Sequence, residues 1–187
     1  MSMQDWSGHT AIVTGGASGL GAATARQLAE SGLKVAIFDL NEAAGQDLAA
    51  QIGGVFARVD VSDPASVAQG LDLAESALGV PRILVNCAGI ADSFTPTLEQ
   101  PLEQFRRLID IHLTGTYAMC RHAAKPMLAR GAGAIVNIGS IASWTALPRR
   151  NGYTAAKTGT LGLTRALACE WAQGGVPRSG AGSSSVR

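Results

Sequence analysis

Short apolar runs rich in β-branched residues alternate with longer helical segments along most of this chain. The runs that we expect to be strands are residues 9–14, 34–39, 55–59, 82–86 and 134–138. Helices are expected between them, the longest at about 102–128, and a last one from Gly152 to about Ala172. Strands without a polar face are typical of a parallel sheet that helices cover on both sides. Right-handed crossovers then predict a doubly wound α/β sheet, whose ligand site lies at the carboxyl ends of the strands.

The composition changes near residue 174. Residues 1–173 suit one globular domain, since hydrophobic residues make up 47% and charged residues 16% of the whole chain. Residues 174–187 are rich in Gly, Ser and Arg and follow no strand or helix period, so we expect a disordered tail there. The net charge of +1 implies no general attraction to nucleic acid or to an anionic membrane.

The sequence shows no pattern of a membrane span, an export signal or a metal site. No apolar run approaches the length of a membrane span, and residues 1–9 lack the charged and apolar regions of a signal peptide. The three cysteines and the three histidines do not have the spacing of metal ligands. We therefore expect free thiols, no bound metal and a cytoplasmic protein.

The first expected strand is joined to the first helix by a glycine-rich turn. Its sequence is Thr14-Gly15-Gly16-Ala17-Ser18-Gly19-Leu20-Gly21. Glycine lets the backbone turn tightly and approach a pyrophosphate, and the helix N-terminus adds free N–H groups. The spacing is T-G-x-x-x-G-x-G rather than G-x-G-x-x-G, and a plain tight turn is the alternative. Between a strand and a helix, the turn predicts a dinucleotide site that includes Gly15, Ser18, Gly19, Leu20 and Gly21.

Asp39 ends the second expected strand, 18 residues after Gly21. A carboxylate at this point can accept hydrogen bonds from the adenosine ribose, and it repels a 2′-phosphate. No Lys or Arg follows it, because Leu40 is next. The pattern favours NAD over NADP as the cofactor, while a helix cap or a solvated strand end is the plainer interpretation of Asp39.

A tyrosine and a lysine, Tyr153 and Lys157, lie four residues apart on the last predicted helix and so share one face. Ser140 lies 13 residues before Tyr153, just after the fifth expected strand. Together with the glycine turn and Asn86-Cys87-Ala88-Gly89, these residues resemble the short-chain dehydrogenase/reductase family in its NAD-binding form. The resemblance covers residues 9 to about 173. It implies a Rossmann-type fold and a dinucleotide-binding and catalytic domain over residues 1–173.

The resemblance implies a hydride transfer between NAD(H) and an alcohol or ketone. Tyrosine ordinarily titrates near ~10, and a neighbouring cation such as Lys157 favours the phenolate that can take the alcohol proton. Ser140 would hydrogen-bond the same substrate oxygen. The family's cofactor contacts fall on further positions of this sequence: Asp60 and Val61 at the adenine, Asn86, Ala88 and Gly89 in the turn that passes the cofactor, and Tyr153 and Lys157 at the nicotinamide ribose.

Two positions depart from the family's pattern. Cys87 stands where a second Asn is frequent, and His112 stands where the family usually has an Asn that holds a water in a relay to the lysine. A backbone carbonyl could bind that water whatever the side chain. His112 is therefore a fourth candidate catalytic residue, and a histidine that only fills a helix position is the alternative.

The segment between Ser140 and Tyr153 is expected to line the substrate pocket. Its Trp144 and its two arginines, Arg149 and Arg150, suit a hydroxyl-rich or anionic substrate, or else they are a packing Trp and solvated charges. A secondary alcohol, with polyols as the leading class, is the expected substrate, and a 3-oxoacyl reductase is the alternative within the enzymes.

Family members usually continue with a sixth strand, a helical segment over the substrate and a seventh strand. The sequence after residue 173 leaves that pattern, so we expect missing C-terminal strands, from a premature end or a frameshift, and an exposed apolar edge at residues 134–138. An inactive or weakly dinucleotide-binding remnant is thus the alternative from another class. The resemblance also implies a homodimer or homotetramer, in which the helices at 102–128 and 160–171 pack against a second copy.

Overall fold

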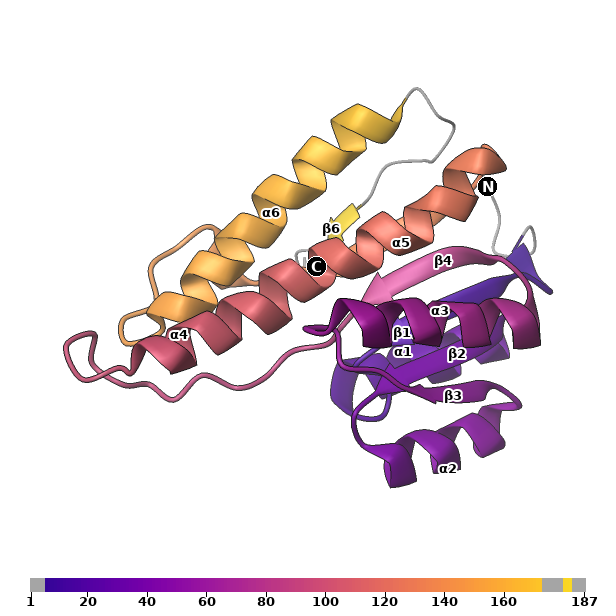
Figure 1. The fold of residues 1–187 in the computed structure, drawn as a ribbon, viewed down its shortest axis with the longest axis horizontal. Coiled ribbons are helices and arrows are strands. Elements are labelled where there is room, and N and C mark those ends of the chain that lie inside the picture. Colours follow the sequence, from indigo (N-terminus) through magenta and orange to yellow (C-terminus); the bar gives the residue numbers. More distant parts are fainter. Residues whose placement is uncertain (1–5, 173–179, 183–187) are drawn as a thin grey trace.

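Within the residues that the structure describes, a parallel sheet of six strands has the order β3-β2-β1-β4-β5-β6 (Figure 1). The structure is a computed structural model that describes residues 6–172 and 180–182. The strands are β1 Thr10–Thr14, β2 Lys34–Asp39, β3 Val55–Arg58, β4 Pro81–Asn86, β5 Ala134–Ile138 and β6 Gly180–Gly182. From β1 the chain crosses first to β2 on one side and later to β4 on the other side, so the strand order reverses at β1. Doubly wound sheets bind their ligands at such a point. The predicted doubly wound α/β fold is confirmed.

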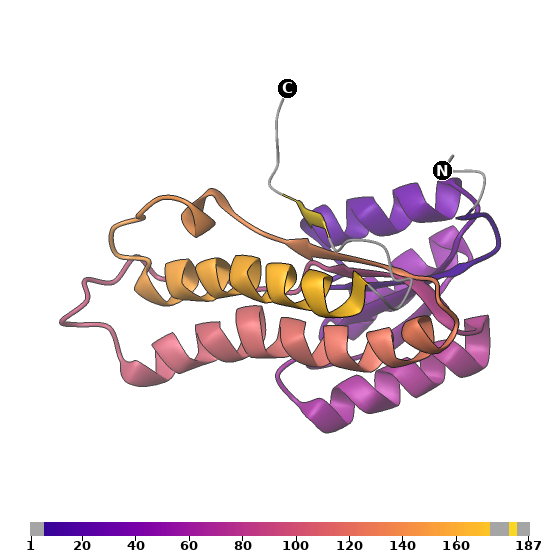
Figure 2. The same cartoon turned by 90° about the horizontal axis from the view of Figure 1, so that it is seen from above.

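Helices cover both faces of the sheet (Figures 1 and 2). They are α1 Gly19–Glu30, α2 Glu42–Ile52, α3 Pro64–Leu78, α4 Leu102–Ile109, α5 Gly115–Ala129 and α6 Asn151–Trp171, with a 3₁₀ turn, η3, at Ile141–Ser143. Helix α2 begins at Asn41, whose side chain accepts the Ala44 amide, and α3 begins at Asp63 followed by Pro64. An Asn or Asp that accepts a backbone amide and a Pro at the first helical position are features that start helices.

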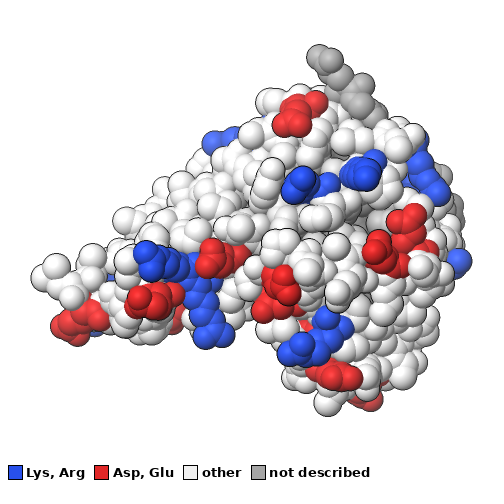
Figure 3. Space-filling view, in the orientation of Figure 1, with Lys and Arg blue, Asp and Glu red and all other residues white. Residues whose placement is uncertain are grey.

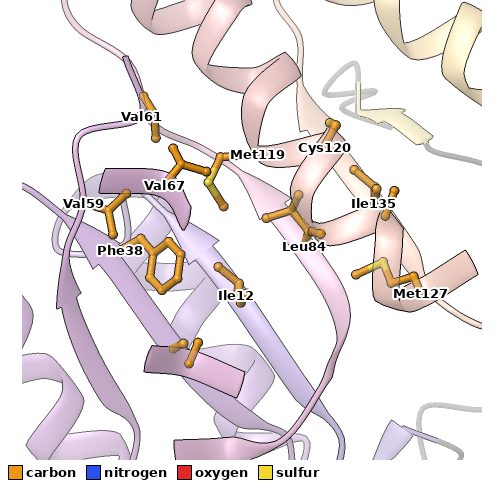
Figure 4. Close-up of a cluster of buried hydrophobic side chains, with 14 of the residues drawn as sticks. Ile12, Phe38, Val59, Val61, Val67, Leu84, Met119, Cys120, Met127 and Ile135 are labelled. Carbon is orange, nitrogen blue, oxygen red and sulfur yellow. The ribbon is translucent and has the colours of Figure 1, made fainter. Parts of the chain in front are cut away.

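Alternate strand residues point into two hydrophobic cores. Ile12 and Phe38 belong to a cluster that includes residues of α3, α5 and α6. The close-up shows them beside side chains of α3 and α5, such as Val67 and Met119 (Figure 4). Val13 and Ile37, the next residues on the same strands, pack with α1 and α2. Both sets are fully buried. Each face of the sheet meets a layer of helices, and the strands therefore have no polar face.

The long helix expected at about 102–128 is continuous but not uniform. Between α4 and α5 the chain forms a π-helical segment, η2, at Asp110–Thr114. The wider π turn shifts every later side chain around the helix axis, and such segments are frequent at functional sites. His112 lies in this segment and is buried.

The short strand β6 corrects two expectations. Gly180–Gly182 pairs in parallel with Val136–Ile138, so this part of the expected tail is a sixth strand and β5 is not an open edge at those residues. Ladder hydrogen bonds need only backbone groups, so a Gly-Ala-Gly segment can pair without any apolar pattern that a sequence would reveal. The expected disorder at 174–179 and 183–187 lies outside the described residues.

The charged side chains on one face of the molecule are of mixed sign. Figure 3 shows basic and acidic residues interspersed on the visible face, in keeping with the net charge of +1. Among the helices of the described residues, none is both long and apolar enough to cross a membrane.

Candidate active site

The glycine turn at the end of β1 folds tightly against the end of β4. Gly15 has a left-handed φ of 61°, and a Cβ there would come within 2.8 Å of the Ala88 Cα atom. A Cβ on Gly21, in the first turn of α1, would overlap the carbonyl oxygen of Gly15. The Ser18 side chain makes no capping hydrogen bond to the start of α1. The turn therefore needs glycine for close backbone approach, and it leaves the N-terminal amides of α1 without a side-chain cap.

A cavity of about 450 Å³ lies at the carboxyl ends of the strands, beside this turn. The predicted cofactor residues that line it are Gly15, Ser18, Gly19, Leu20, Gly21, Asp39, Asp60, Val61, Ala88 and Gly89. Cys87, Ile90 and Ile111 complete the wall near α5. Most of the residues predicted to bind a cofactor thus meet at one cavity, although they come from separate loops.

Two carboxylates in the cavity wall are held by hydrogen bonds. Asp39 accepts the Ala17 amide at 3.0 Å with one oxygen and the Asn41 amide at 2.9 Å with the other. Asp39 therefore ties the glycine turn to the end of β2. Asp60 accepts both the backbone amide and the hydroxyl of Ser62, at 2.9 and 2.6 Å.

Asn86 lies apart from this cavity. It is buried, and its amide nitrogen donates to the Asn137 side-chain oxygen at 2.8 Å. Asn137 in turn donates to the Thr164 hydroxyl at 2.9 Å. This chain of buried polar groups links β4, β5 and α6 through the side chain of Asn86. That the turn starting at Asn86 passes the cofactor stays a prediction.

Tyr153 and Lys157 lie one turn apart on α6, near the end of β5. The Lys157 Nζ atom donates to the Ile138 carbonyl at 2.7 Å and lies 5.9 Å from the centroid of the Tyr153 ring. Burial lowers the pKa of Lys157. Neither residue lines the cavity wall, but the charge of Lys157 acts on the Cys87 thiol, which does.

Ser140 follows β5 directly. Its hydroxyl oxygen accepts the Ala142 amide at 3.1 Å and so starts the η3 turn. The Ser143 hydroxyl donates to the Lys157 carbonyl at 2.8 Å, which fixes this turn to α6. The serine and the two α6 residues are thereby held on adjoining segments of the chain.

His112 connects the loop that follows β4 to Tyr153. Its Nε2 atom lies 3.1 Å from the Ile90 nitrogen and 3.0 Å from the Ile90 oxygen, and its ring meets the Tyr153 ring edge to face at 5.2 Å. A Cβ on Gly89 would overlap the imidazole. Burial, and then the charge of Lys157, lower the pKa of His112, so the ring is neutral at neutral pH.

The backbone carbonyl of His112 accepts the Thr116 hydroxyl at 2.9 Å. The Thr160 hydroxyl lies 3.2 Å from the same carbonyl but only 2.9 Å from the Ala156 carbonyl, and it has a single proton to donate. A water relay through the carbonyl or the side chain of His112 stays a prediction.

Cys87 is a half-buried thiol in the cavity wall. Desolvation raises its pKa to about 11, against the opposing effect of the Lys157 charge. The thiol is thus protonated at neutral pH. No group of three or more possible ligands among the described residues is placed to hold a metal ion.

Two residues of the coil between β4 and α4 have a role that the sequence did not indicate. Phe94, in the coil between β4 and α4, lies with its ring against the guanidinium of Arg150, which precedes α6. Asp92, two residues before Phe94, is buried and raises the pKa of His112 against the larger opposing effects. The path of this coil depends on tertiary packing, so no sequence pattern predicts the contact between Phe94 and Arg150.

Comparison with known proteins places this geometry in context. A family model described as short chain dehydrogenase matches residues 9–181. D-threitol dehydrogenase of Mycolicibacterium smegmatis is 42% identical over 175 residues, which are 90% of this chain and 66% of that protein. The 2-dehydro-3-deoxy-L-rhamnonate dehydrogenase (NAD(+)) of a Sphingomonas species is 41% identical over 91% of this chain and 69% of its own.

A solved structure shows the same fold. It is described as ribose-5-phosphate isomerase of Brucella melitensis and matches with a TM-score of 0.89 and 35% identity, over 94% of this chain and 67% of that one. The chain therefore spans about two thirds of the length of the proteins it resembles.

Proposed function

Because the chain belongs to the short chain dehydrogenase family, we propose that it is an oxidoreductase that transfers a hydride between NAD(H) and a secondary alcohol or ketone. The observation that carries this proposal is the position of Tyr153. The centroid of its ring lies 5.9 Å from the buried ammonium of Lys157 and 5.2 Å from the centroid of the neutral His112 ring, which contacts the loop after β4 at Ile90. A phenol with a cation on one side can exchange a proton with a substrate oxygen.

The cavity fits a dinucleotide. Its glycine turn has no room for side chains at Gly15 and Gly21, while a Cβ on Gly19 would meet no atom within 4 Å. The uncapped start of α1 offers amides and the positive end of the helix dipole to a pyrophosphate. When bound there, NAD accepts the hydride from the alcohol carbon. Gly15, Ser18, Leu20 and Gly21 would hold the phosphates, and Asp60 and Val61 the adenine.

NAD rather than NADP is proposed as the cofactor because of Asp39. Its carboxylate lines the cavity, and no Lys or Arg of the described residues lines it. A 2′-phosphate would meet a negative charge with no cation to offset it. The NAD(+) in the name of the Sphingomonas relative agrees with this choice.

Four residues of the chain would have separate roles in the proton transfer. Tyr153 takes the hydroxyl proton during oxidation and returns it during reduction. Lys157, fixed to the Ile138 carbonyl, favours the phenolate by its charge. Ser140 would donate a hydrogen bond to the substrate oxygen. His112 would hold the loop at Ile90 and the ring of Tyr153 in position.

The test is NADH formation by the purified chain with a panel of polyols and secondary alcohols, D-threitol among them since one relative is named for it. We expect oxidation of at least one secondary alcohol with NAD and much slower reaction with NADP. If no alcohol is oxidised and no NADH binds, the chain is a remnant without this activity and the proposal is wrong.

A further inference from the structure

The contact between Phe94 and Arg150 lies beside Tyr153 and has no part in the chemistry above. The guanidinium carbon of Arg150 is 4.1 Å from the centroid of the Phe94 ring and 5.5 Å from the centroid of the Tyr153 ring. Both distances are within the range of cation–π attraction. A positive charge is therefore held next to the phenol that we assign to proton transfer.

The backbone on both sides of this contact is strained. Among the described residues, the non-glycine residues with a left-handed φ are Phe94, at 50°, and Arg149, at 64°. A bulky side chain in this region costs free energy, and the conformation persists only where surrounding contacts hold it. One strained residue supplies the ring and the other immediately precedes the guanidinium. The fold therefore accepts strain at two places that together position Arg150.

Arg150 retains unused hydrogen-bonding capacity. Its buried Nε atom has no partner, and it forms no ion pair with an acidic residue of the part of the chain that the structure describes. Asp92 does not supply one, since its Oδ1 atom accepts the Ser93 amide and its Oδ2 atom has no partner. Contacts to ring faces leave the N–H edge of a guanidinium available, and that edge matches the two oxygens of a carboxylate.

We propose that Arg150 binds a carboxylate of the substrate, so that the protein acts on hydroxy acids and on the corresponding oxo acids in reverse. This inference rests on the proposed function and names its substrate class. In the oxidation the alcohol carbon gives its hydride to NAD and the hydroxyl gives its proton to Tyr153. The products are the oxo acid, NADH and one proton, and the carboxylate is unchanged. Phe94 keeps the guanidinium within reach of the same small molecule that contacts Tyr153.

The experiment compares each hydroxy acid with its neutral amide. Glycerate, threonate and gluconate, each beside its amide, are assayed for NADH formation by wild type and by Arg150→Gln, Arg150→Lys and Phe94→Leu. We expect wild type to prefer at least one acid over its amide by about tenfold to a hundredfold in kcat/KM, since a charge-assisted pair is lost with the amide. Arg150→Gln should bring that ratio near one by raising KM for the acid, and Arg150→Lys should retain part of it.

Arg149→Gln is the matched control, because it removes the same charge from the neighbouring, exposed residue. It should change the acid-to-amide ratio by no more than about threefold if the effect is a direct contact rather than a general field. The inference would be contradicted if Arg149→Gln and Arg150→Gln reduced the acid-to-amide ratio of kcat/KM equally. A preference of wild type for amides, polyols or phosphate esters would contradict it as well. Neither result would contradict the proposed function.

The two proposals can fail separately. If the chain turns over none of these compounds, gluconate binding in the presence of NADH is measured by saturation-transfer NMR. Binding by wild type and Arg149→Gln but not by Arg150→Gln supports the carboxylate site. Absent binding, or equal binding by all three proteins, overturns it.

Discussion

The Nε2 atom of His112 lies 3.1 Å from the backbone nitrogen of Ile90, which donates to it, and 3.0 Å from the carbonyl oxygen of the same residue. Protonation at Nε2 would replace the hydrogen bond from the Ile90 amide by one to the Ile90 carbonyl, and that carbonyl and the charge of Asp92 raise the pKa of His112. Burial and the Lys157 charge lower the pKa and outweigh them. The environment of His112, between the loop after β4 and the π-helical segment, therefore favours the neutral imidazole on balance.

This relationship predicts acid sensitivity. An unfolded histidine titrates near ~6.5, and the folded pKa of His112 is lower, so the unfolded chain binds more protons once the pH falls below the unfolded value. The stability that neutral His112 contributes is present above about pH 6.5 and is lost as the pH falls through the folded pKa. Urea unfolding of wild type and His112→Asn, between about pH 7.5 and 5, should show a steeper loss for wild type. Parallel curves would refute this.

Asp39 should set the choice of cofactor. Asp39→Asn keeps an oxygen for the Ala17 or Asn41 amide but removes the charge, while Asp39→Ala removes both. Each variant should narrow the ratio of NAD to NADP affinity by about tenfold to a hundredfold, from a charge-assisted contact of about 1.5–3 kcal/mol. Titration with NADH and NADPH measures the ratio. An unchanged ratio in Asp39→Asn means that charge repulsion does not determine specificity.

Replacing glycine by alanine should have opposite effects on stability in the glycine turn and in the middle of a helix. Gly21→Ala would force the new Cβ onto the Gly15 carbonyl, so we expect a loss of about 1–3 kcal/mol in unfolding free energy and weakened NADH binding. Gly162→Ala, in the middle of α6, meets no atom within 4 Å and should stabilise the protein by about 1 kcal/mol. Thermal unfolding with and without NADH distinguishes the two, and full NADH binding by Gly21→Ala would count against the turn as the phosphate site.

The paired helices predict self-association. Figure 1 shows α4 and α5 running beside α6 and extending past the sheet, and Leu102 and Tyr117 on this layer are 54% and 47% exposed. We predict a homodimer that covers this layer. Sedimentation equilibrium should give the dimer mass at micromolar concentration, and Tyr117→Glu should weaken the association at least about tenfold, because it places a charge in an apolar contact. A monomer at that concentration excludes this interface.

Much of the fold could be predicted because its signals are local. Apolar runs such as 34–39 depend on a few neighbouring residues, and the structure has β2 at Lys34–Asp39. Helix caps such as Asn41 and Asp63 are local in the same way. Strand β6 was missed, since Gly-Ala-Gly carries no side-chain pattern and pairs through its backbone alone. The π turn at Asp110–Thr114 was also missed, because five residues are too few to reveal a change of helical period.

The candidate site could be predicted where residues share a motif, as in the glycine turn and the Tyr153–Lys157 pair. Contacts between distant segments could not. The bond of Asn86 to Asn137 depends on β4 and β5 being neighbours, and the Phe94–Arg150 contact depends on the path of a coil between β4 and α4. Both are tertiary relationships that a single sequence does not encode as a pattern.

Turnover by Tyr153→Phe tests the central claim most directly. The variant keeps the ring that meets His112 and lies near Lys157, but it lacks the hydroxyl that would exchange the proton. With an alcohol that wild type oxidises, NADH formation should fall by about 10²- to 10⁴-fold, while NADH binding followed by fluorescence stays largely intact. Retention of most of the wild-type rate would contradict the assignment of Tyr153 as the acid–base group.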